Sequence, residues 1–442
     1  MVHRVKLAWP GRSWTVGNAT RNTHPPRVVE VVGDGAHRIV QGDVLDVAPG
    51  LSDRVELVYV DPPYASDRDY TAEARLDGPA DGRVVRTKAY GDKWDADGAY
   101  LEMLAPRLEA LCNLLSDTGT IWVHLDWRSA YVVRVVLEEI LGRDCFMNEI
   151  VWRRAPNLGR QAASGQFGRT LDTILVYGKT ERASIKHHPT RLEPIEPNAI
   201  RWDDEGRPFT SAPRGDYTDA SIAKLDKEGR VHRTASGRVY IKYFLVKNDE
   251  GVLCRERRVD ALWTDVAPLR HAAASERTGY PTQKPRALLE RIIRCATNPG
   301  DLVVDGFAGS GTTGVAAHAL GRRAILCDTS PVAMANARAR MLREGAGVRI
   351  ERVGAAPPAS GPRVRVENKK GLVRLVEPEE PLAWAVGTEE MGVFRCAWHG
   401  ERMPGTKPRP APREADVSAL GKRVPLRVRV WGDDGSVGEA SP

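Results

Sequence analysis

Residues 61–64, Asp-Pro-Pro-Tyr, combine a carboxylate, two rigid residues and an aromatic ring directly after the predicted strand Val55–Val60. Asp61 offers acceptor oxygens at the C-terminal end of a predicted strand, where open α/β sheets place their ligands. Pro62 and Pro63 fix φ and have no backbone N–H, so the turn is stiff and presents only carbonyls. Tyr64 can stack on a flat ring. The combination suits a site for an amino-bearing ring, although Asp-Pro also opens ordinary turns.

Residues 302–314 have the pattern of a strand, a glycine turn and the start of a helix. Gly309, Gly311 and Gly314 satisfy GxGxxG, which lets the backbone approach a ligand closely. Asp328 ends the next predicted strand, where an acid can accept hydrogen bonds from both ribose hydroxyls. NAD enzymes share this pattern, and a Walker A loop is excluded because it lacks the required lysine. A cofactor with a nucleoside is predicted, with a purely structural glycine turn as the alternative.

The segment Thr282-Gln-Lys-Pro285 bears on the choice of cofactor. It precedes the helix that leads into the glycine strand, where Lys284 can pair with a small carboxylate. S-adenosylmethionine has such a carboxylate, an adenosine and a ribose, but no pyrophosphate. Asp61 and Tyr64 have no role in hydride transfer. These features favour S-adenosylmethionine over NAD.

The elements that must position these residues alternate along the chain, which indicates a parallel sheet covered by helices. Apolar periodicity predicts helices over 100–115, 129–141, 286–296, 312–320 and 331–343, and strands over 55–60, 120–125, 302–304 and 323–326. Residues 66–95 are polar and glycine-rich, and predict a long loop beside the site.

Composition excludes several classes of protein. The chain of 442 residues is 42% hydrophobic and 28% charged, with no apolar run of the roughly 18 residues that a membrane span needs. Its first residues lack the apolar core of a signal peptide, so we expect a cytoplasmic protein without membrane partners. Six cysteines without CxxC pairs argue against disulfide frameworks and metal sites. A net charge of +7 is compatible with a polyanionic partner.

Residues 152–266 differ in composition from the segments before and after them, because arginines recur among glycine, serine, asparagine and aromatic residues. They predict an inserted, basic, loop-rich module suited to phosphate and base contacts, and a solvated insertion is the alternative. The candidates for reading base edges follow a predicted strand: Arg153, Arg154, Asn157 and Arg160. Further strands are expected over 173–177 and 239–247. After residue 345, short strands are expected over 363–367, 371–376 and 425–431.

Together these segments resemble the amino-DNA methyltransferases of the β arrangement, in which the Asp-Pro-Pro-Tyr segment precedes the Phe-x-Gly-x-Gly segment. The matching pieces occur in order: Gly42-Asp43, Asp61–Tyr64, Gly119–Trp127, Leu262–Asp265, Glu276–Pro285 and Asp305–Thr313. The chain is most similar to modification subunits of type III restriction systems and related adenine methylases. A chance collection of motifs on another α/β enzyme is the alternative.

The resemblance implies an α/β fold with a permuted, Rossmann-like S-adenosylmethionine-dependent methyltransferase sheet. The expected parts are an N-terminal arm (1–37), a catalytic half (38–151), an inserted target-recognition module (152–266), a cofactor-binding half (267–345) and a small β-rich C-terminal extension (346–442). The two halves would fold against each other although they are far apart in sequence, which is tolerated because domain termini often lie close together.

The resemblance also assigns roles to residues. Asp61, Pro62, Pro63 and Tyr64 would be catalytic. Asp328 would hold the ribose, Asp43 would contact the cofactor adenine, and Thr282 and Lys284 would bind the methionine end. Asp305 is either an acceptor in the pocket or a strand-end residue. The remaining cofactor-pocket residues would be Phe307, Gly309, Gly311 and Thr312.

The implied activity is methyl transfer to N6 of an adenine flipped out of double-stranded DNA. An initial Asp in the Pro-Pro-Tyr motif favours adenine over N4 of cytosine in this family. Three more functions fit parts of the pattern: RNA or small-molecule methylation, an inactive DNA-binding subunit and an NAD-dependent oxidoreductase. The sequence leaves open the recognition site, a restriction endonuclease partner and a homodimer.

Overall fold

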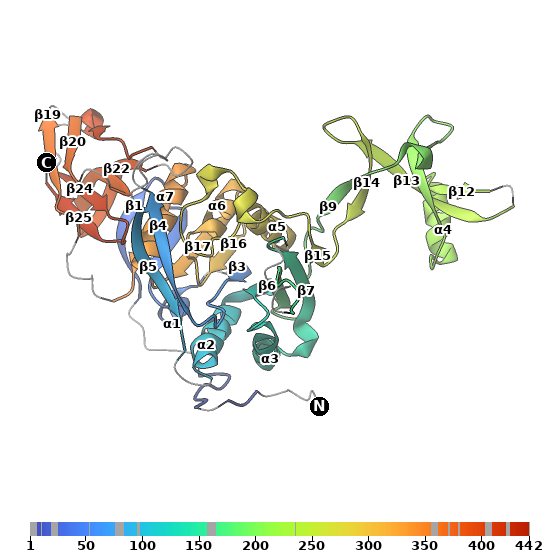
Figure 1. Cartoon of the computed structure of the whole chain (residues 1–442), viewed down its shortest axis with the longest axis horizontal. Helices are drawn as coiled ribbons and strands as arrows, with labels where there is room; N and C mark the ends of the chain where they lie inside the picture. The colour runs from blue at the N-terminus through green and yellow to red at the C-terminus, as the bar shows by residue number, and fades with distance from the viewer. Residues whose placement is uncertain are drawn as a thin grey trace. The chain divides into compact units, whose positions relative to one another are not determined.

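The computed structural model describes residues 7–9, 11–18, 25–52, 54–75, 84–94, 98–156, 165–234, 236–354, 361–369, 372–378, 381–402, 409–420 and 425–441. The chain divides into two compact units. His188–Asp260 form the small unit, and Met1–His187 with Ala261–Pro442 form the core unit. Figure 1 labels the elements of both.

Among the described residues, the core unit is built on one sheet of fourteen strands. In spatial order these are β15 (Leu262–Trp263), β7 (Phe146–Arg153), β8 (Leu171–Gly178), β6 (Leu115–Leu125), β3 (Val55–Val60), β16 (Leu302–Asp305), β17 (Arg323–Asp328), β2 (His37–Gln41), β18 (Val348–Arg352), β1 (Arg27–Val32), β22 (Val393–Glu401), β21 (Ala383–Glu390), β24 (Leu426–Trp431) and β25 (Val437–Ala440).

The strands from β6 to β18 run parallel, and β3 lies between β6 and β16. Tyr59 is in register with Asp305. The residues that follow β3 and β16 therefore leave the sheet side by side. The expected α/β sheet, in which the later half of the chain pairs with the earlier half, is confirmed.

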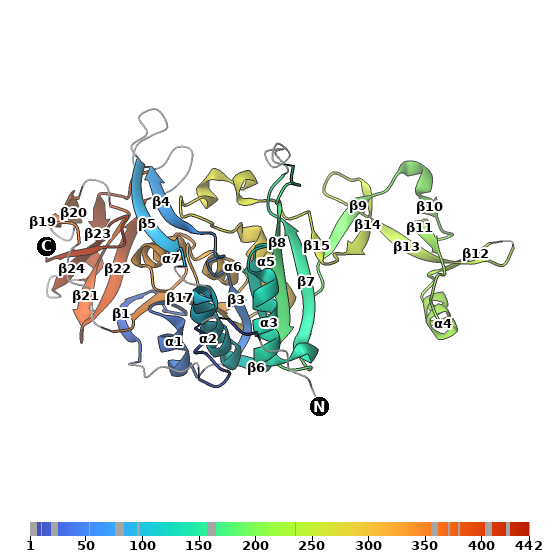
Figure 2. The same cartoon turned by 60° about the horizontal axis from the view of Figure 1, so that its bottom comes forward.

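Helices cover both faces of this sheet (Figure 2). One face carries α1 (Val44–Val47), α2 (Ala99–Leu114) and α3 (Ala130–Leu141), and the other carries α5 (Arg286–Ala296), α6 (Thr312–Ala319) and α7 (Pro331–Arg343). The leucines at 104, 108 and 111 are spaced to face one side of α2, and they pack in a buried cluster with strand residues such as Val58 and Ile121. No described helix is long and apolar enough to cross a membrane.

The prediction of a long loop over 66–95 is wrong. β4 (Arg68–Arg75) and β5 (Val84–Asp92) form an antiparallel hairpin. The run Val-Val-Arg-Thr-Lys-Ala-Tyr at 84–90 contains β-branched and aromatic residues that favour strands. The density of charged residues around them concealed this pattern. The backbone N–H of Glu73 donates to the carbonyl of Gly279 (2.9 Å), so the hairpin is attached to the segment before α5.

Both ends of the chain contribute to the core sheet. β1 lies within the range expected to be an N-terminal arm, and β18, β21, β22, β24 and β25 lie in the C-terminal extension. The strands expected over 363–367, 371–376 and 425–431 are confirmed as β19 (Arg365–Lys369), β20 (Leu372–Glu377) and β24. β19 and β20 form a separate sheet with β23 (Glu414–Asp416).

The small unit contains an antiparallel sheet and the α-helix α4 (Asp219–Lys227). Its strands are β10 (Arg201–Trp202), β11 (Pro208–Pro213), β13 (Val239–Lys247), β14 (Leu253–Arg258) and β9 (Thr190–Pro194), with β12 (Val231–Arg233) on β13. The small unit contains fewer residues than the inserted module expected over 152–266, because β8 belongs to the core sheet.

The small unit is less basic than its arginine content suggests. It holds 14 Lys and Arg against 13 Asp and Glu. Arginines at 191, 207, 214, 230 and 233 form ion pairs with carboxylates of the same unit. Most of this charge is therefore balanced locally.

Candidate active site

A cavity of about 550 Å³ lies at the carboxyl ends of β3 and β16. Its lining brings together most of the predicted site residues: Asp43, Asp61, Pro62, Pro63, Tyr64, Thr282, Lys284, Asp305, Phe307, Gly309, Thr312 and Asp328. Gly311 caps α6 with a φ of 75°, and a Cβ there would lie 2.7 Å from the Cβ of Ala337. That glycine therefore allows α6 and α7 to pack closely.

Both carboxylate oxygens of Asp61 are engaged. The hydroxyl of Tyr64 donates to Oδ1, and the ammonium of Lys284 lies 2.5 Å from Oδ2. Lys284 comes from the segment before α5, so this ion pair joins the two halves of the site. The lysine predicted to hold a cofactor carboxylate thus contacts the predicted catalytic carboxylate.

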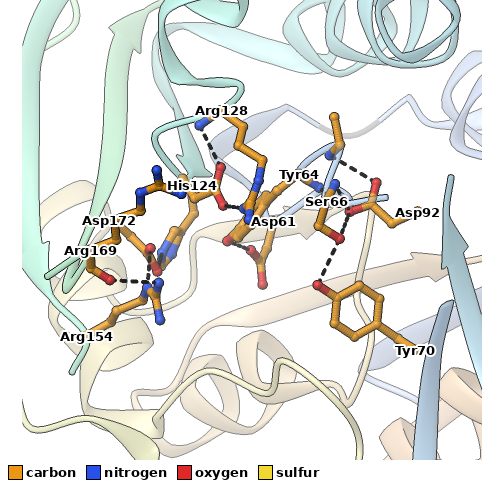
Figure 3. A network of polar contacts seen from close by, with 12 residues as sticks. Asp61, Tyr64, Ser66, Tyr70, Asp92, His124, Arg128, Arg154, Arg169 and Asp172 are labelled. Carbon is orange, nitrogen blue, oxygen red and sulfur yellow. Dashed lines mark hydrogen bonds and ion pairs between the residues drawn. The ribbon is translucent and has the colours of Figure 1, made fainter. Parts of the chain in front are cut away.

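The ring of Tyr64 has neighbours besides Asp61 (Figure 3). The imidazole of His124 stacks on it with centroids 6.3 Å apart and planes at 24°, and Lys284 Nζ lies 5.2 Å from its centroid. Burial, with the negative charge of Asp61 beside it, raises the pKa of Tyr64 well above its usual value. The hydroxyl therefore stays protonated and donates to Asp61.

The glycine turn after β16 is organised by two carboxylates. Asp328 accepts the N–H groups of Gly309 (2.9 Å) and Ser330 (2.8 Å). Asp305 accepts the N–H of Phe307 (3.0 Å) and the hydroxyl of Thr313. Burial raises the pKa of Asp305 to about 7 and also raises the pKa of Asp328. Asp305 thus closes the turn and lines the cavity at once.

The sequence of the chain is similar to known proteins over about two thirds of its length. A family model described as DNA methylase, covering the N6 and N4 types, matches residues 55–338. The chain belongs to this DNA methylase family. Type II methyltransferase M.EcaI of Enterobacter cloacae is 28% identical over 302 residues, which are 63% of this chain and 62% of that protein. The type III restriction-modification enzyme StyLTI Mod subunit of Salmonella typhimurium is 27% identical over 349 residues, 67% and 52% respectively.

The chain therefore spans about half to three fifths of the length of these two relatives. Among solved structures, the complex of M1.HpyAVI with S-adenosylmethionine matches at 17% identity with a TM-score of 0.38, covering 69% of this chain and 98% of that one.

Asp43 of the methylase is already partnered. Its carboxylate caps α1 by accepting the N–H of Leu45 (3.1 Å) and forms an ion pair with Arg107. It lines the cavity at the start of α1. Its contact with a cofactor adenine stays a prediction.

Asp92 is a site residue that sequence reasoning missed. It is only 1% exposed, and its carboxylate accepts the N–H groups of Tyr64 (3.1 Å), Ala65 (3.0 Å) and Ser66 (2.8 Å). It also accepts the indole N–H of Trp94 (2.9 Å). Asp92 therefore fixes the turn after the Asp-Pro-Pro-Tyr segment, and its place at the end of β5 was hidden by the loop prediction.

The hairpin also supplies an aromatic wall to the cavity. Tyr70 and Tyr90 stack with centroids 4.8 Å apart and planes at 19°. Their hydroxyls reach Ser66 Oγ (3.0 Å) and Thr282 Oγ1 (2.9 Å). The hairpin thus connects the Asp-Pro-Pro-Tyr turn to the segment that carries Lys284.

A buried polar chain lies behind Tyr64 (Figure 3). His124 contacts the hydroxyl of Tyr59 (3.0 Å) through Nδ1 and Asp172 (3.2 Å) through Nε2, and Arg154 Nε donates to Asp172 (2.7 Å). Burial favours the protonated form of Asp172, but the hydrogen bond and charge of His124 outweigh burial and lower its pKa. This chain holds the imidazole that stacks on Tyr64.

The predicted DNA-reading residues fall in different places. Arg154 forms the partly exposed end of this polar chain and also donates to the carbonyl of Arg169 (3.2 Å). Arg153 is exposed at the end of β7. Asn157 and Arg160 lie outside the described residues. The part of the chain that is described holds no cluster of three or more metal-ligating side chains.

Proposed function

We propose that the chain is a site-specific DNA methyltransferase that transfers the methyl group of S-adenosylmethionine to N6 of adenine in double-stranded DNA. The observation that carries this proposal is the shared cavity, in which Asp61 and Lys284 meet the glycine turn and Asp328. Membership of the DNA methylase family supports the reaction class.

The cavity suits S-adenosylmethionine in size and in the chemistry of its walls. About 550 Å³ is within the range of roughly 300–1,000 Å³ usual for small-molecule sites. Lys284 would hold the carboxylate of the cofactor, and Asp328 would hold the ribose with the lone pairs that Gly309 and Ser330 leave free. When bound, the cofactor supplies an electrophilic methyl group.

The chain's own residues would prepare the target amine. The exocyclic amine is a weak nucleophile because its lone pair is delocalised into the ring. Asp61 and the carbonyl of Pro62 would accept its two N–H bonds, which directs the lone pair toward the methyl group. Asp61 would then take the released proton, directly or through water. The hydroxyl of Tyr64 keeps the Asp61 carboxylate oriented during these steps.

Lys284 would couple the two substrates. Its ammonium lies 2.5 Å from Asp61 Oδ2 and 5.2 Å from the ring of Tyr64, which are the groups that must receive the base. An ammonium has three N–H donors and can bind two carboxylates at once, as Lys186 does with Glu56 and Asp301. Lys284 would therefore link the cofactor carboxylate to Asp61.

Adenine is the proposed target because the motif begins with Asp61 rather than serine and because a type III Mod subunit is among the relatives. The family model covers both N6 and N4 methylases, so N4 of cytosine is the second candidate. Sequence reading by the stretch 152–266 remains a prediction, as do a restriction endonuclease partner and a homodimer.

The test is methyl transfer from labelled S-adenosylmethionine to unmethylated genomic DNA, followed by mass spectrometry of the nucleosides. N6-methyladenine is expected, and sequencing of the methylated DNA then maps the site. Detection of N4-methylcytosine would show that the target base is cytosine instead of adenine. No methylated nucleoside, from protein that binds the cofactor tightly, would contradict it.

A further inference from the structure

An exposed group of aromatic and basic side chains lies beside the catalytic end of the sheet. We call Trp127, Arg128 and Arg169, together with Phe167 two residues before Arg169 in the chain, the aromatic-basic patch. Trp127 is 45% exposed and Phe167 is 98% exposed. β3 and β6 are parallel with Val60 opposite Val123, so Trp127 follows β6 at the edge where the catalytic segment follows β3.

The two arginines of the patch gather at the indole. The guanidinium carbon of Arg169 lies 4.0 Å from the ring centroid of Trp127, and that of Arg128 lies 4.9 Å from it. Arg128 pairs with Asp126, whereas Arg169 donates to the neutral amide of Gln166 and has no ion pair with a described carboxylate. The patch therefore presents positive charge that the described residues leave unbalanced.

The patch is attached to the residue chain that holds Tyr64 (Figure 3). Arg154 donates to the carbonyl of Arg169 (3.2 Å) and to Asp172, which contacts His124, and His124 stacks on Tyr64. Four consecutive contacts thus fix the patch relative to the ring expected to receive the base. An isolated exposed aromatic residue would need no explanation, but Trp127 lies against the guanidinium of Arg169, whose carbonyl is joined to the site through Arg154.

We propose that the aromatic-basic patch contacts the DNA duplex beside the flipped base. Arg169 and Arg128 bind backbone phosphates, and Phe167 inserts as a wedge at the base step that the flipped base leaves open. Apolar wedges of this kind stabilise unstacked steps, and arginines beside an aromatic ring match the phosphate charge. This inference rests on the proposed function and extends it to a surface in the core unit.

The phosphate contact is tested by DNA binding as a function of salt. Arg169→Ala should reduce the slope of log affinity against log salt by about one, with unchanged affinity for S-adenosylmethionine. Arg395→Ala is the matched control, because Arg395 is an exposed arginine in the C-terminal extension, paired with Glu390. A slope for Arg169→Ala equal to that of the control overturns the phosphate contact.

The wedge is tested with a duplex that carries the mapped methylation sequence. Phe167→Ala should lower kcat/KM about tenfold when the target base is paired, and much less when it is mismatched, since a mismatched base flips at lower cost. Phe167→Leu should restore most of the activity. Met391→Ala is the control, because Met391 is 99% exposed but lies between β21 and β22, which several strands separate from β6 in the core sheet.

The outcomes separate this inference from the proposed function. Suppose that the wild-type protein methylates DNA and that Phe167→Ala has the same kcat/KM as Met391→Ala on the paired duplex. The proposed wedge role of Phe167 is then wrong, and the methyltransferase proposal stands. An equal loss on paired and mismatched duplexes would also overturn the wedge. If the wild-type protein neither binds nor methylates DNA, both proposals fail.

Discussion

At the scale of single residues, Asp61 determines what the site can hold. Tyr64 and Lys284 occupy its two oxygens, so the carboxylate is shielded from both sides. This is favourable for a charged group in a partly buried position, because the hydrogen bond and the ion pair offset part of the cost of desolvating the carboxylate.

Asp61→Ala should abolish methyl transfer without weakening cofactor binding. Removing the carboxylate takes away the acceptor of the target amine and frees Lys284 for the cofactor carboxylate. The affinity for S-adenosylmethionine, measured by calorimetry, should therefore be equal to or higher than that of the wild type. A marked loss of cofactor affinity would show that Asp61 supports the fold of the cavity instead.

Asp305 should make stability depend on pH. Its pKa is raised to about 7 in the folded protein, against about 4 for an unfolded aspartate. The folded state thus holds the proton more tightly, so its stabilising effect is complete below about pH 4 and is lost as the pH rises to about 7. Urea unfolding should show that the wild type loses stability relative to Asp305→Asn over this range. A difference that is constant with pH would contradict the burial argument.

At the scale of elements, the β4–β5 hairpin is the device that completes the cavity. Asp92 at its end orders the turn after the Asp-Pro-Pro-Tyr segment, and Tyr70 with Tyr90 forms one wall. The hairpin is attached where Glu73 donates to Gly279. A Cβ on Gly279 would lie 1.8 Å from the carbonyl oxygen of Glu73, so only glycine allows this contact.

Gly279→Ala should detach the hairpin and lower activity at least tenfold, because the clash is with backbone that cannot give way. Gly300→Ala is the matched control. Gly300 has a similar φ (+86° against +81°) but nothing within 4 Å of its Cβ position, so its substitution costs only about 1 kcal/mol of backbone strain. Activity and limited proteolysis of the hairpin separate the two. Equal behaviour of both variants would show that the hairpin contact is dispensable.

Local signals predicted the strongly periodic elements well. The helices expected over 286–296 and 331–343 have the observed bounds of α5 and α7. The hairpin was missed because its alternating apolar residues stand among many charges. The role of Asp92 depends on where β5 ends in space, which local sequence does not encode. The cited ion pairs of the small unit join residues no more than seven positions apart, so counting both signs of charge along 188–260 would have indicated that its charge is balanced.

At the scale of the whole molecule, the core unit is joined to its own C-terminal extension through a buried charge. Arg338 of α7 forms ion pairs with Glu30 of β1 and Glu401 of β22, and its guanidinium lies 3.6 Å from the ring centroid of Trp431. Arg338 and both carboxylates are buried. Buried pairs of this kind are costly to break, because a charge is left without a partner.

Arg338→Ala should therefore destabilise the protein by about 3–5 kcal/mol, since two buried carboxylates lose their cation. Arg395→Ala breaks an exposed pair with Glu390 and should cost less than about 1 kcal/mol. Urea unfolding of the two variants measures the difference. Similar losses would mean that Arg338 is not what joins the extension to the core.

The order of strands in the core sheet has a consequence for synthesis on the ribosome. β3 ends at Val60, but its neighbour β16 begins at Leu302, and β1 pairs with β22, which begins at Val393. At a translation rate of about 5–20 residues per second, β16 is synthesised on the order of 10–50 s after β3. Throughout that time the apolar edge of a half-made sheet stays open to wrong pairing. The nascent chain should therefore depend on chaperones, and its sheet closes only after most of the chain has left the ribosome.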